Sequence, residues 1–223
     1  MLPYAVARSQ VFDRSVFDPV LQMLDLDLSD AQVGHLMSHL TLLRRWNQVM
    51  NLTTIRDPRL VVERHFGESL FLATRLPETA RNLVDIGSGA GFPGLPVGVV
   101  RPALAVSLVE SAKKKAVFLR EAARGLSNVT VIENRFECTE GQFDWATARA
   151  VAVPRVLEVA QARVEWLALL TTVDQLPGLL EAEGVSWRSP EPLPWGQKRV
   201  LVVGKMFHVE QSNMFHVEHS VLD

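Results

Sequence analysis

Spaced glycines that follow an apolar run are the first candidates for a binding site in this chain. The run Leu83–Ile86 includes Asp85 and leads into Gly87, Gly89 and Gly91. A short aliphatic run of this kind is typical of a strand buried on both faces of a parallel sheet. Glycine has no Cβ, so it adopts positive φ and lets a ligand lie directly on backbone N–H groups. The segment predicts a binding turn at the carboxyl end of a strand.

A second acid stands at the end of the next apolar run. Ala105–Val109 leads into Glu110, nineteen residues after Gly91. Dinucleotide-binding folds place a carboxylate there to accept hydrogen bonds from ribose hydroxyls. Together the two runs predict a site for a ribose-bearing cofactor, and a βα turn with a solvated acid is the alternative.

Two cofactors compete for this site. The segment Gly89–Gly94 satisfies the dinucleotide pattern G-x-G-x-x-G, which requires a helix N-terminus to hold a pyrophosphate. Pro93 and Pro96 fall where that helix should begin. Read from Asp85 to Gly91, the same segment resembles motif I of S-adenosylmethionine-dependent methyltransferases, whose cofactor has no pyrophosphate. The prolines favour the second interpretation.

The alternation of strand and helix patterns along the remaining chain predicts an α/β fold with a doubly wound, mostly parallel sheet and an N-terminal helical cap. With motif I, this pattern resembles the Rossmann-like fold of class I methyltransferases. We expect a cap over 1–78 within the same compact unit, a cofactor-binding domain over 79–205 and a disordered repeat tail over 206–223. The predicted strands are 83–86, 105–110, 129–132, 144–148, 166–172, 185–188 and 200–203, the last antiparallel. One predicted helix begins near residue 95, and two others span 112–124 and 154–164.

Composition is that of a soluble globular protein. The chain has 223 residues, is 48% hydrophobic and carries a formal charge of −2. Its longest apolar runs are far shorter than a membrane span, and its start lacks the apolar core of a signal peptide. A single cysteine, Cys138, excludes a disulfide framework and a cysteine-based metal cluster. We expect a cytoplasmic protein without a metal.

Nucleic-acid binding would need local basic patches, because the net charge gives no global attraction. One patch begins at Lys113 and Lys114, and the other lies in the cap and includes Arg56 and Arg64. A solvated helix face is the alternative for the first patch. His65, beside Arg64, is of a type that is more often structural than catalytic.

Several further motifs carry a family resemblance over about residues 35–163. They are Asn51-Leu52-Thr53, Arg64-His65, Gly91-Phe92-Pro93-Gly94-Leu95-Pro96, Arg101-Pro102, Phe118-Leu119-Arg120, Asn134-Arg135-Phe136-Glu137 and Arg149-Ala150. With motif I, they make the chain resemble the bacterial ribosomal RNA small-subunit methyltransferase G family, also called glucose-inhibited division protein B.

The resemblance implies methyl transfer from S-adenosyl-L-methionine to N7 of a guanine in the decoding-site loop of 16S rRNA. It implies a 16S rRNA or small-subunit partner, with no membrane, and we expect a monomer. The implied cofactor residues are Gly87, Gly89, Gly91, Phe92, Glu110, Phe136, Glu137 and Arg149, the last also a positioning candidate. The resemblance also implies that Lys114 and Arg135 face the RNA, and the basic patches and the cap add Arg56, Arg64, His65 and Lys113 as RNA-binding candidates. A dinucleotide-dependent oxidoreductase and a noncatalytic RNA-binding module remain alternatives.

Guanine N7 carries a free lone pair in the neutral base, so its methylation needs in-line positioning and no general base. We accordingly expect no catalytic base. The chain also lacks the N/D-P-P-Y/F tetrapeptide that grips an exocyclic adenine amine. Cys138 lacks the preceding proline typical of pyrimidine C5 methyltransferases.

Three positions depart from the family pattern. Leu170 stands where a lysine is usual, Glu68 stands where aspartate is usual, and the stretch Trp166–Trp187 is shortened. The first change predicts altered activity, because it removes a cation expected near the RNA or the cofactor.

The C-terminus repeats Met206–Gln211 as Met214–His219. Both copies can be encoded as ATG TTC CAC GTG GAA CA, which from its second base reads TGTTCCACGTGGAACA, a perfect palindrome. It resembles the chromosome-partition sites that bind a centromere-binding protein. We interpret the tail as the translation of two copies of a DNA site, and we expect methylation not to need it. Histidine and glutamate ligands for a metal are the alternative.

Overall fold

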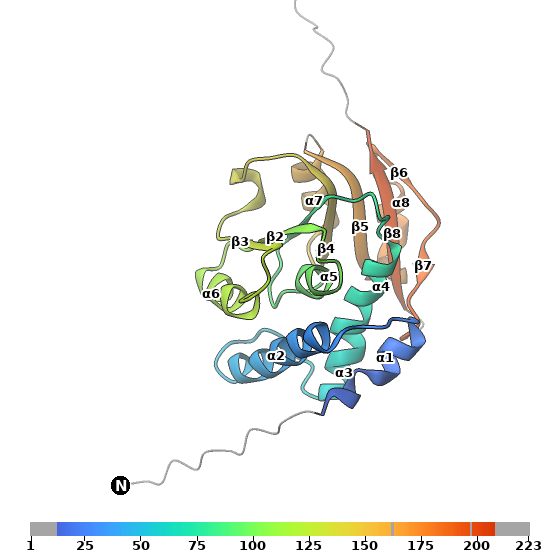
Figure 1. The fold of residues 1–223 in the computed structure, drawn as a ribbon. Coiled ribbons are helices and arrows are strands. Elements are labelled where there is room, and N and C mark those ends of the chain that lie inside the picture. The colour runs from blue at the N-terminus through green and yellow to red at the C-terminus, as the bar shows by residue number, and fades with distance from the viewer. Residues whose placement is uncertain (1–12, 162, 197, 208–223) are drawn as a thin grey trace, which may run out of the picture.

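The computed structural model describes residues 13–161, 163–196 and 198–207. Helices and strands alternate from residue 82 to residue 187, and two further strands then follow without a helix between them (Figure 1). The helical elements are η1 (Arg14–Val16), α1 (Asp18–Met23), α2 (Asp30–Asn47), α3 (Pro58–Val61), the π-helical η2 (Val62–Gly67), α4 (Glu68–Arg75), α5 (Gly94–Val100), α6 (Lys113–Ala122), η3 (Phe136–Cys138), α7 (Val153–Ala160), η4 (Val173–Gln175) and α8 (Leu176–Leu180). The strands are β1 (Asn82–Ile86), β2 (Ala105–Val109), β3 (Val129–Ile132), β4 (Phe143–Arg149), β5 (Val164–Thr172), β6 (Val185–Trp187), β7 (Glu191–Pro192) and β8 (Arg199–Met206).

One sheet organises the molecule, with the strand order β3-β2-β1-β4-β5-β8-β6 and β7 paired to β8. The first five strands in that order are parallel to their neighbours, and β8 is antiparallel to β5. The order reverses beside β1, which places the carboxyl ends of β1 and β4 at the crevice where such sheets bind ligands. The predicted fold class and the late antiparallel strand are confirmed.

The helical cap shares its core with one face of the sheet. Leu36 and Leu40 of α2 and Leu70 of α4 are fully buried in the same cluster as Leu95 of α5 and Leu108 of β2. A second cluster covers the other face of the sheet, where α7 and α8 pack. Residues of the cap and of the sheet therefore share one hydrophobic cluster.

The longest cap helix, α2, begins as its sequence directs. Ser29 and Gln32 form a capping box, in which the Ser29 side chain accepts from the Gln32 N–H and the Gln32 side chain accepts from the Ser29 N–H. This exchange satisfies two backbone donors that a helix start otherwise leaves unpaired. Gln32 also donates to the Val99 carbonyl oxygen at 3.2 Å, which ties the helix to α5.

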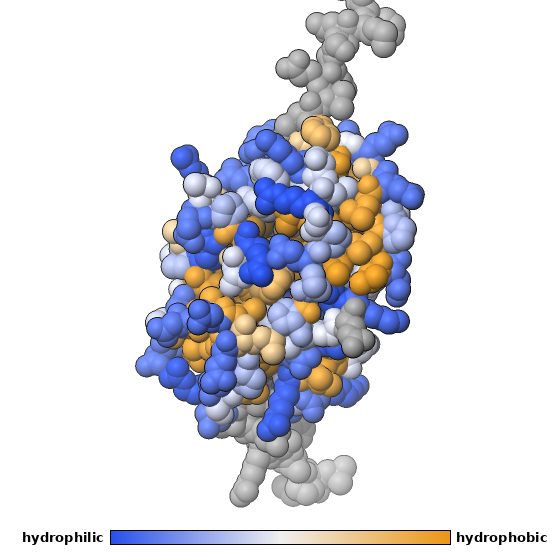
Figure 2. Space-filling model, turned by 90° about the vertical axis from the view of Figure 1, so that its right-hand side faces the viewer, coloured by the Kyte–Doolittle hydropathy of each residue, from blue (hydrophilic) through white to orange (hydrophobic). Residues whose placement is uncertain are grey.

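Short strands close the far edge of the sheet. Figure 2 faces this edge and shows hydrophilic side chains interspersed with apolar areas. β7 contains Pro192, which cannot donate to a further strand. Met206, placed at the start of the tail by sequence, is the last residue of β8 and is buried. The rest of the tail, from residue 208, lies outside the described residues.

Candidate cofactor and substrate site

The glycine segment forms a tight loop between β1 and α5. Gly87, Gly89 and Gly91 have φ values of +73°, +56° and +88°. Such values strain any residue that carries a Cβ. The Gly87 and Ser88 N–H groups donate to the Val109 carbonyl oxygen at 2.9 and 3.0 Å. These bonds hold the loop, which follows β1 as the sequence predicts, against the carboxyl end of β2.

Glu110 fastens that loop to the start of the next helix. Its Oε2 accepts from the Gly89 N–H at 3.0 Å, and its Oε1 accepts from the Ala112 N–H at 2.7 Å. Glu110 is 6% exposed. Because each carboxylate oxygen has a second lone pair, the group retains acceptors for ribose hydroxyls. The spacing to Gly91 located this acid, but it did not predict the loop-tying bonds.

An open cavity of about 140 Å³ lies beside Glu110, at the carboxyl ends of β1, β2 and β3. Its lining combines apolar walls with a charged rim. The lining residues are Ile86, Gly87, Val109, Glu110, Ser111, Asn134, Arg135, Phe136, Glu137, Val151, Arg155, Val156 and Val159. The cavity brings together Gly87, Glu110, Phe136 and Glu137 of the predicted cofactor set, as well as Arg135 of the predicted RNA set.

Gly89 and Gly91 belong to the loop itself and do not line this cavity. Phe92, also predicted for the cofactor, is buried under the cap between two histidines. Its ring lies 4.7 Å from that of His39 and 4.9 Å from that of His65, measured between centroids. Burial lowers the pKa of His39 to about 4 and that of His65 to about 3. Both rings are therefore neutral at physiological pH.

His65 has the environment of a structural histidine. Its Nε2 lies 2.7 Å from the Thr53 hydroxyl oxygen. Thr53 and Leu52 are in turn held by the Asn47 side chain, which accepts from both N–H groups at 2.9 and 2.8 Å. The Asn51-Leu52-Thr53 motif thus shapes a cap loop that supports His65. An RNA contact by this buried ring stays a prediction.

Asp85 is buried at the N-terminus of α5. Its Oδ2 accepts from the Gly94 N–H at 3.0 Å. Burial raises the pKa of this carboxyl group to about 7. The Leu95 N–H donates to the Gly91 carbonyl oxygen, and Pro96 has no N–H. The first turn of α5 is thus closed to a pyrophosphate, which is the ligand that the dinucleotide interpretation requires.

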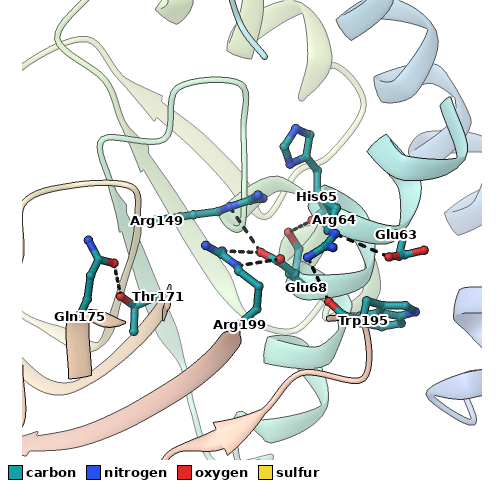
Figure 3. Close-up of polar contacts among 10 residues, drawn as sticks. Glu63, Arg64, His65, Glu68, Arg149, Thr171, Gln175, Trp195 and Arg199 are labelled. Carbon is teal, nitrogen blue, oxygen red and sulfur yellow. Dashed lines mark hydrogen bonds and ion pairs between the residues drawn. The ribbon is translucent and has the colours of Figure 1, made fainter. Parts of the chain in front are cut away.

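Arg149 ends β4 in a buried ion-pair cluster (Figure 3). Its Nε lies 3.5 Å from Glu68 Oε2, and Arg199 donates to both oxygens of the same carboxylate at 3.0 and 2.7 Å. Burial lowers the pKa of Arg149, and the Glu68 charge opposes that shift. An arginine remains cationic through such shifts. The cluster therefore joins α4 of the cap to β4 and β8.

The predicted RNA residues separate into surface and tethered groups. Lys113, Lys114 and Arg135 are exposed at the carboxyl edge of the sheet, and Arg56 is exposed in the cap. Arg64 is half-buried and donates to the Trp195 carbonyl oxygen at 3.1 Å. The first three cations stand beside the cavity, because they follow β2 and β3.

Two residues near the site were missed by sequence reasoning. Arg155 of α7 lines the cavity and pairs with Glu137 and with Glu158. Arg199 of β8 holds Glu68. An isolated arginine carries no spacing signal, so only the folded chain reveals either contact.

Among solved structures, this fold matches class I methyltransferases. A SAM-dependent methyltransferase from Aquifex aeolicus superposes with a TM-score of 0.56 at 13% identity, over 70% of this chain and 97% of that one. The magnesium protoporphyrin IX methyltransferase of Synechocystis PCC 6803 with bound SAM gives a TM-score of 0.54 at 13% identity, over 81% and 98%. The fold and the loop at the end of β1 define the class.

Within this class, the family model GidB, described as rRNA small subunit methyltransferase G, matches residues 32–167. The chain belongs to this family. It is 48% identical over 130 residues to the ribosomal RNA small subunit methyltransferase G of Xylella fastidiosa strain M23, covering 56% of this chain and 60% of that protein. The relative from Roseiflexus castenholzii is 45% identical over 135 residues, covering 57% and 58%. The alignments thus span about 60% of the length of these curated relatives.

The described residues contain no helix long and apolar enough to cross a membrane. They also contain no group of three or more His, Cys, Asp or Glu residues placed to hold a metal ion.

Proposed function

We propose that this protein transfers a methyl group from S-adenosyl-L-methionine to N7 of a guanine in 16S rRNA of the small ribosomal subunit. The observation that carries the proposal is the family match over a chain whose glycine loop, Glu110 and cavity lie at the carboxyl edge of the sheet. Consistent with this function, we place the enzyme in the cytoplasm as a monomer.

The cavity suits the adenosine part of the cofactor. Glu110 is placed to accept hydrogen bonds from the ribose hydroxyls. Val109, Phe136 and Val156 provide apolar walls for a flat base, and Phe136 is held by Arg163, whose guanidinium carbon lies 4.5 Å from the ring centroid. When bound, the cofactor supplies an electrophilic sulfonium methyl group.

For this reaction the protein has to position the guanine N7 against the methyl group and to stabilise the charge that develops. N7 attacks with a lone pair that is already free, so no residue has to remove a proton first. Positive charge develops on the guanine ring as the bond forms, and fixed dipoles or charges of the site stabilise it. Neutral His39 and His65 are buried in the cap core, and this mechanism assigns neither a proton transfer.

RNA binding is assigned to the cations beside the cavity. Lys113, Lys114 and Arg135 are exposed on adjacent connections of one edge. Phosphate contacts of this kind position a nucleic acid without reading its sequence. Arg56 extends the basic surface onto the cap. We expect binding to weaken steeply with salt, because each neutralised phosphate releases counterions.

The dinucleotide alternative is disfavoured by Asp85, whose carboxyl group occupies the N-terminus of α5. The noncatalytic alternative rests on Leu170, which is 2% exposed and pairs with Arg149 across β4 and β5. Calorimetry with S-adenosylmethionine and NAD tests the first point. Binding of NAD alone would refute the proposed cofactor.

The acceptor is tested by incubating the protein with small ribosomal subunits and methyl-labelled cofactor. Label in 16S rRNA supports the enzyme. Subunit binding without label would favour the noncatalytic module, and a Leu170→Lys variant that gained activity would locate the cause.

A further inference from the structure

A second pocket lies on the cap, between the end of α2 and the connection from α2 to α3. Its volume is about 160 Å³, close to the 140 Å³ of the cavity proposed for the adenosine. This cap pocket therefore has room for a ligand of the size of a nucleoside. Its lining residues are Leu43, Arg44, Asn47, Gln48, Thr53, Ile55, Arg56 and Val61.

The cap pocket combines apolar walls with polar groups. Leu43 and Val61 are buried, and Ile55 is half-buried. Gln48 and Arg56 are exposed, and neither side chain has a hydrogen-bond or ion-pair partner among the described residues. Small-molecule sites have this composition, in which apolar walls hold a ring and a few polar groups fix its orientation. A ligand in the cap pocket would supply the partners that these two side chains lack.

Hydrogen bonds within the cap hold the pocket in shape. The Asn47 amide oxygen accepts from the Leu52 and Thr53 N–H groups, and its nitrogen donates to the Thr53 carbonyl oxygen at 2.9 Å. The Ile55 N–H donates to the Thr53 hydroxyl oxygen at 3.1 Å. These bonds fix the connection on the end of α2, so a ligand meets a preformed pocket. Binding then loses little free energy to ordering of the protein.

The chain around the cap pocket is rich in positive charge. Residues 41–62 contain four arginines and one acid. The acid is Asp57, whose Oδ1 accepts from the Arg59 and Leu60 N–H groups. An excess of this sign attracts a polyanion. A nucleic-acid strand fits both features, because its phosphates would meet the surrounding arginines while one of its bases enters the pocket.

The cap pocket lies close to the cofactor loop. Thr53, which lines it, has its hydroxyl oxygen 2.7 Å from His65 Nε2. The His65 ring in turn lies 4.9 Å from the ring of Phe92, which belongs to the loop between β1 and α5. One side chain thus separates the wall of the pocket from that loop. An RNA that reaches the methyl donor with one nucleotide can reach the cap with another.

We propose that the cap pocket receives an unpaired nucleobase of the substrate RNA, from a nucleotide near the methylated guanine. The inference rests on the proposed function. Bases of single-stranded RNA loops are splayed out and bound one at a time through their hydrogen-bonding edges. The Gln48 amide offers a donor and an acceptor, and Arg56 offers donors. A phosphate alone matches the pocket less well, because its apolar walls offer a phosphate no hydrogen bond.

The test compares two short single-stranded RNAs of equal length and charge. One carries bases, and the other has abasic nucleotides throughout. Fluorescence anisotropy measures the affinity of the full chain for each RNA. Wild type should prefer the base-bearing RNA. We expect Gln48→Ala to weaken that RNA about 3- to 10-fold, the range of a neutral hydrogen bond, and the abasic RNA less than about twofold.

A pair of charge variants separates base binding from phosphate binding. Arg56→Gln should weaken the base-bearing RNA more than the abasic RNA, since Arg56 lines the cap pocket. The matched control is Arg59→Gln, which removes the same charge from an exposed position of α3 outside the pocket. It should weaken both RNAs alike. Calorimetry with S-adenosylmethionine should give one cofactor affinity for all these proteins, which shows that each variant is folded.

Methyl transfer to small ribosomal subunits gives a second readout. Gln48→Ala and Arg56→Gln should raise KM for the subunits and leave kcat close to that of wild type. A base held away from the reacting atoms is bound equally in the ground state and the transition state, so its loss acts on KM alone.

Equal losses for both RNAs in Arg56→Gln, with no effect of Gln48→Ala, would overturn the inference in favour of a surface that binds only phosphate. Equal affinity of wild type for the two RNAs would overturn it as well. Variants that bind both RNAs normally but bind small subunits weakly would assign the pocket to a ribosomal protein. If wild type shows the base preference and the variants lose it, yet no label enters 16S rRNA, the pocket stands and the proposed function fails.

Discussion

Single residues at the carboxyl edge of the sheet hold charges in a buried setting. Asp85 and Glu68 are fully buried, and Glu110 nearly so. Asp85 accepts a hydrogen bond from the N-terminus of α5, and Glu68 pairs with two guanidinium groups. Glu110 accepts from the glycine loop. Burial of this kind is costly for a charge unless hydrogen bonds compensate it. We therefore expect substitution of these acids to change both the stability of the fold and ligand binding.

Asp85 should make stability fall as pH rises. Burial raises its pKa from 3.8 to about 7, so between those values the folded state binds more protons than the unfolded state. The contribution of Asp85 is greatest below pH 4 and is lost as pH rises toward 7. Asp85→Asn should flatten this part of the profile and be the more stable protein at pH 8. Urea unfolding of both proteins from pH 4 to 8 measures it, and parallel profiles would contradict the assigned pKa.

Glu110→Gln should loosen the glycine loop. The amide offers one acceptor oxygen in place of two, while the Gly89 and Ala112 N–H groups both need one. Losing a hydrogen bond to a charged group costs about 1.5–3 kcal/mol. We expect that loss of unfolding free energy in urea, with weaker cofactor binding by calorimetry. Glu133→Gln, which alters an exposed pair with Arg120, is the matched control and should change little. Equal effects of the two variants would refute the role of Glu110.

At the scale of elements, the sequence predicts most of the sheet. Short β-branched runs placed β1, β2 and β3 within a residue of their observed bounds, because buried parallel strands leave an unbroken apolar signal. The helix predicted over 154–164 instead ends at Ala160, and β5 begins at Val164. Neither β7 nor the π-helical turn of η2 was expected, since both depend on packing against distant elements.

The candidate site was predictable where spacing carries meaning. The glycine loop and Glu110 follow from strand ends and a fixed interval, and both lie where expected. Arg155, Arg199 and the buried state of His65 follow from tertiary contacts that span many residues of sequence. No local pattern encodes such contacts.

Gly94 should be required by the packing of α5 on the sheet. A Cβ there would lie 2.5 Å from Leu108 Cδ2 and 2.7 Å from Asp85 Cβ. Gly94→Ala should cost about 1–3 kcal/mol of stability, as overpacking in a core does. Gly34 of α2 has nothing within 4 Å of such an atom, so Gly34→Ala should stabilise by about 0.5–1 kcal/mol. Urea unfolding compares the two, and a harmless Gly94→Ala would contradict the packing.

The whole molecule is a methyltransferase fold whose cap and sheet share one hydrophobic cluster. Because the cluster is shared, residues of the cap pack against the sheet in addition to offering the implied contacts with RNA. His39 and His65 pack on Phe92 of the cofactor loop. The cap therefore packs against the loop between β1 and α5, and we expect the cap and the sheet to unfold together.

Removal of residues 208–223 should leave the enzyme intact. β8 is complete at Met206, which is buried, and Phe207 donates to the Gly184 carbonyl oxygen at 2.9 Å. We expect an unchanged Tm and unchanged cofactor affinity for the shortened chain, measured by calorimetry. A zinc-dependent Tm in the full chain, lost on truncation, would instead support the metal interpretation of the repeat. Codons that spoil the palindrome would refute its DNA-level interpretation.

Methyl transfer to a guanine of the small subunit can be measured by incubating the protein with methyl-labelled S-adenosylmethionine and with small subunits from a strain that lacks this gene. Mass mapping of the 16S rRNA then locates the label. We predict one labelled nucleotide, a guanine methylated at N7, and a strong loss of label with Glu110→Ala. Label on another base, on ribosomal protein or on no component of the subunit would contradict the account.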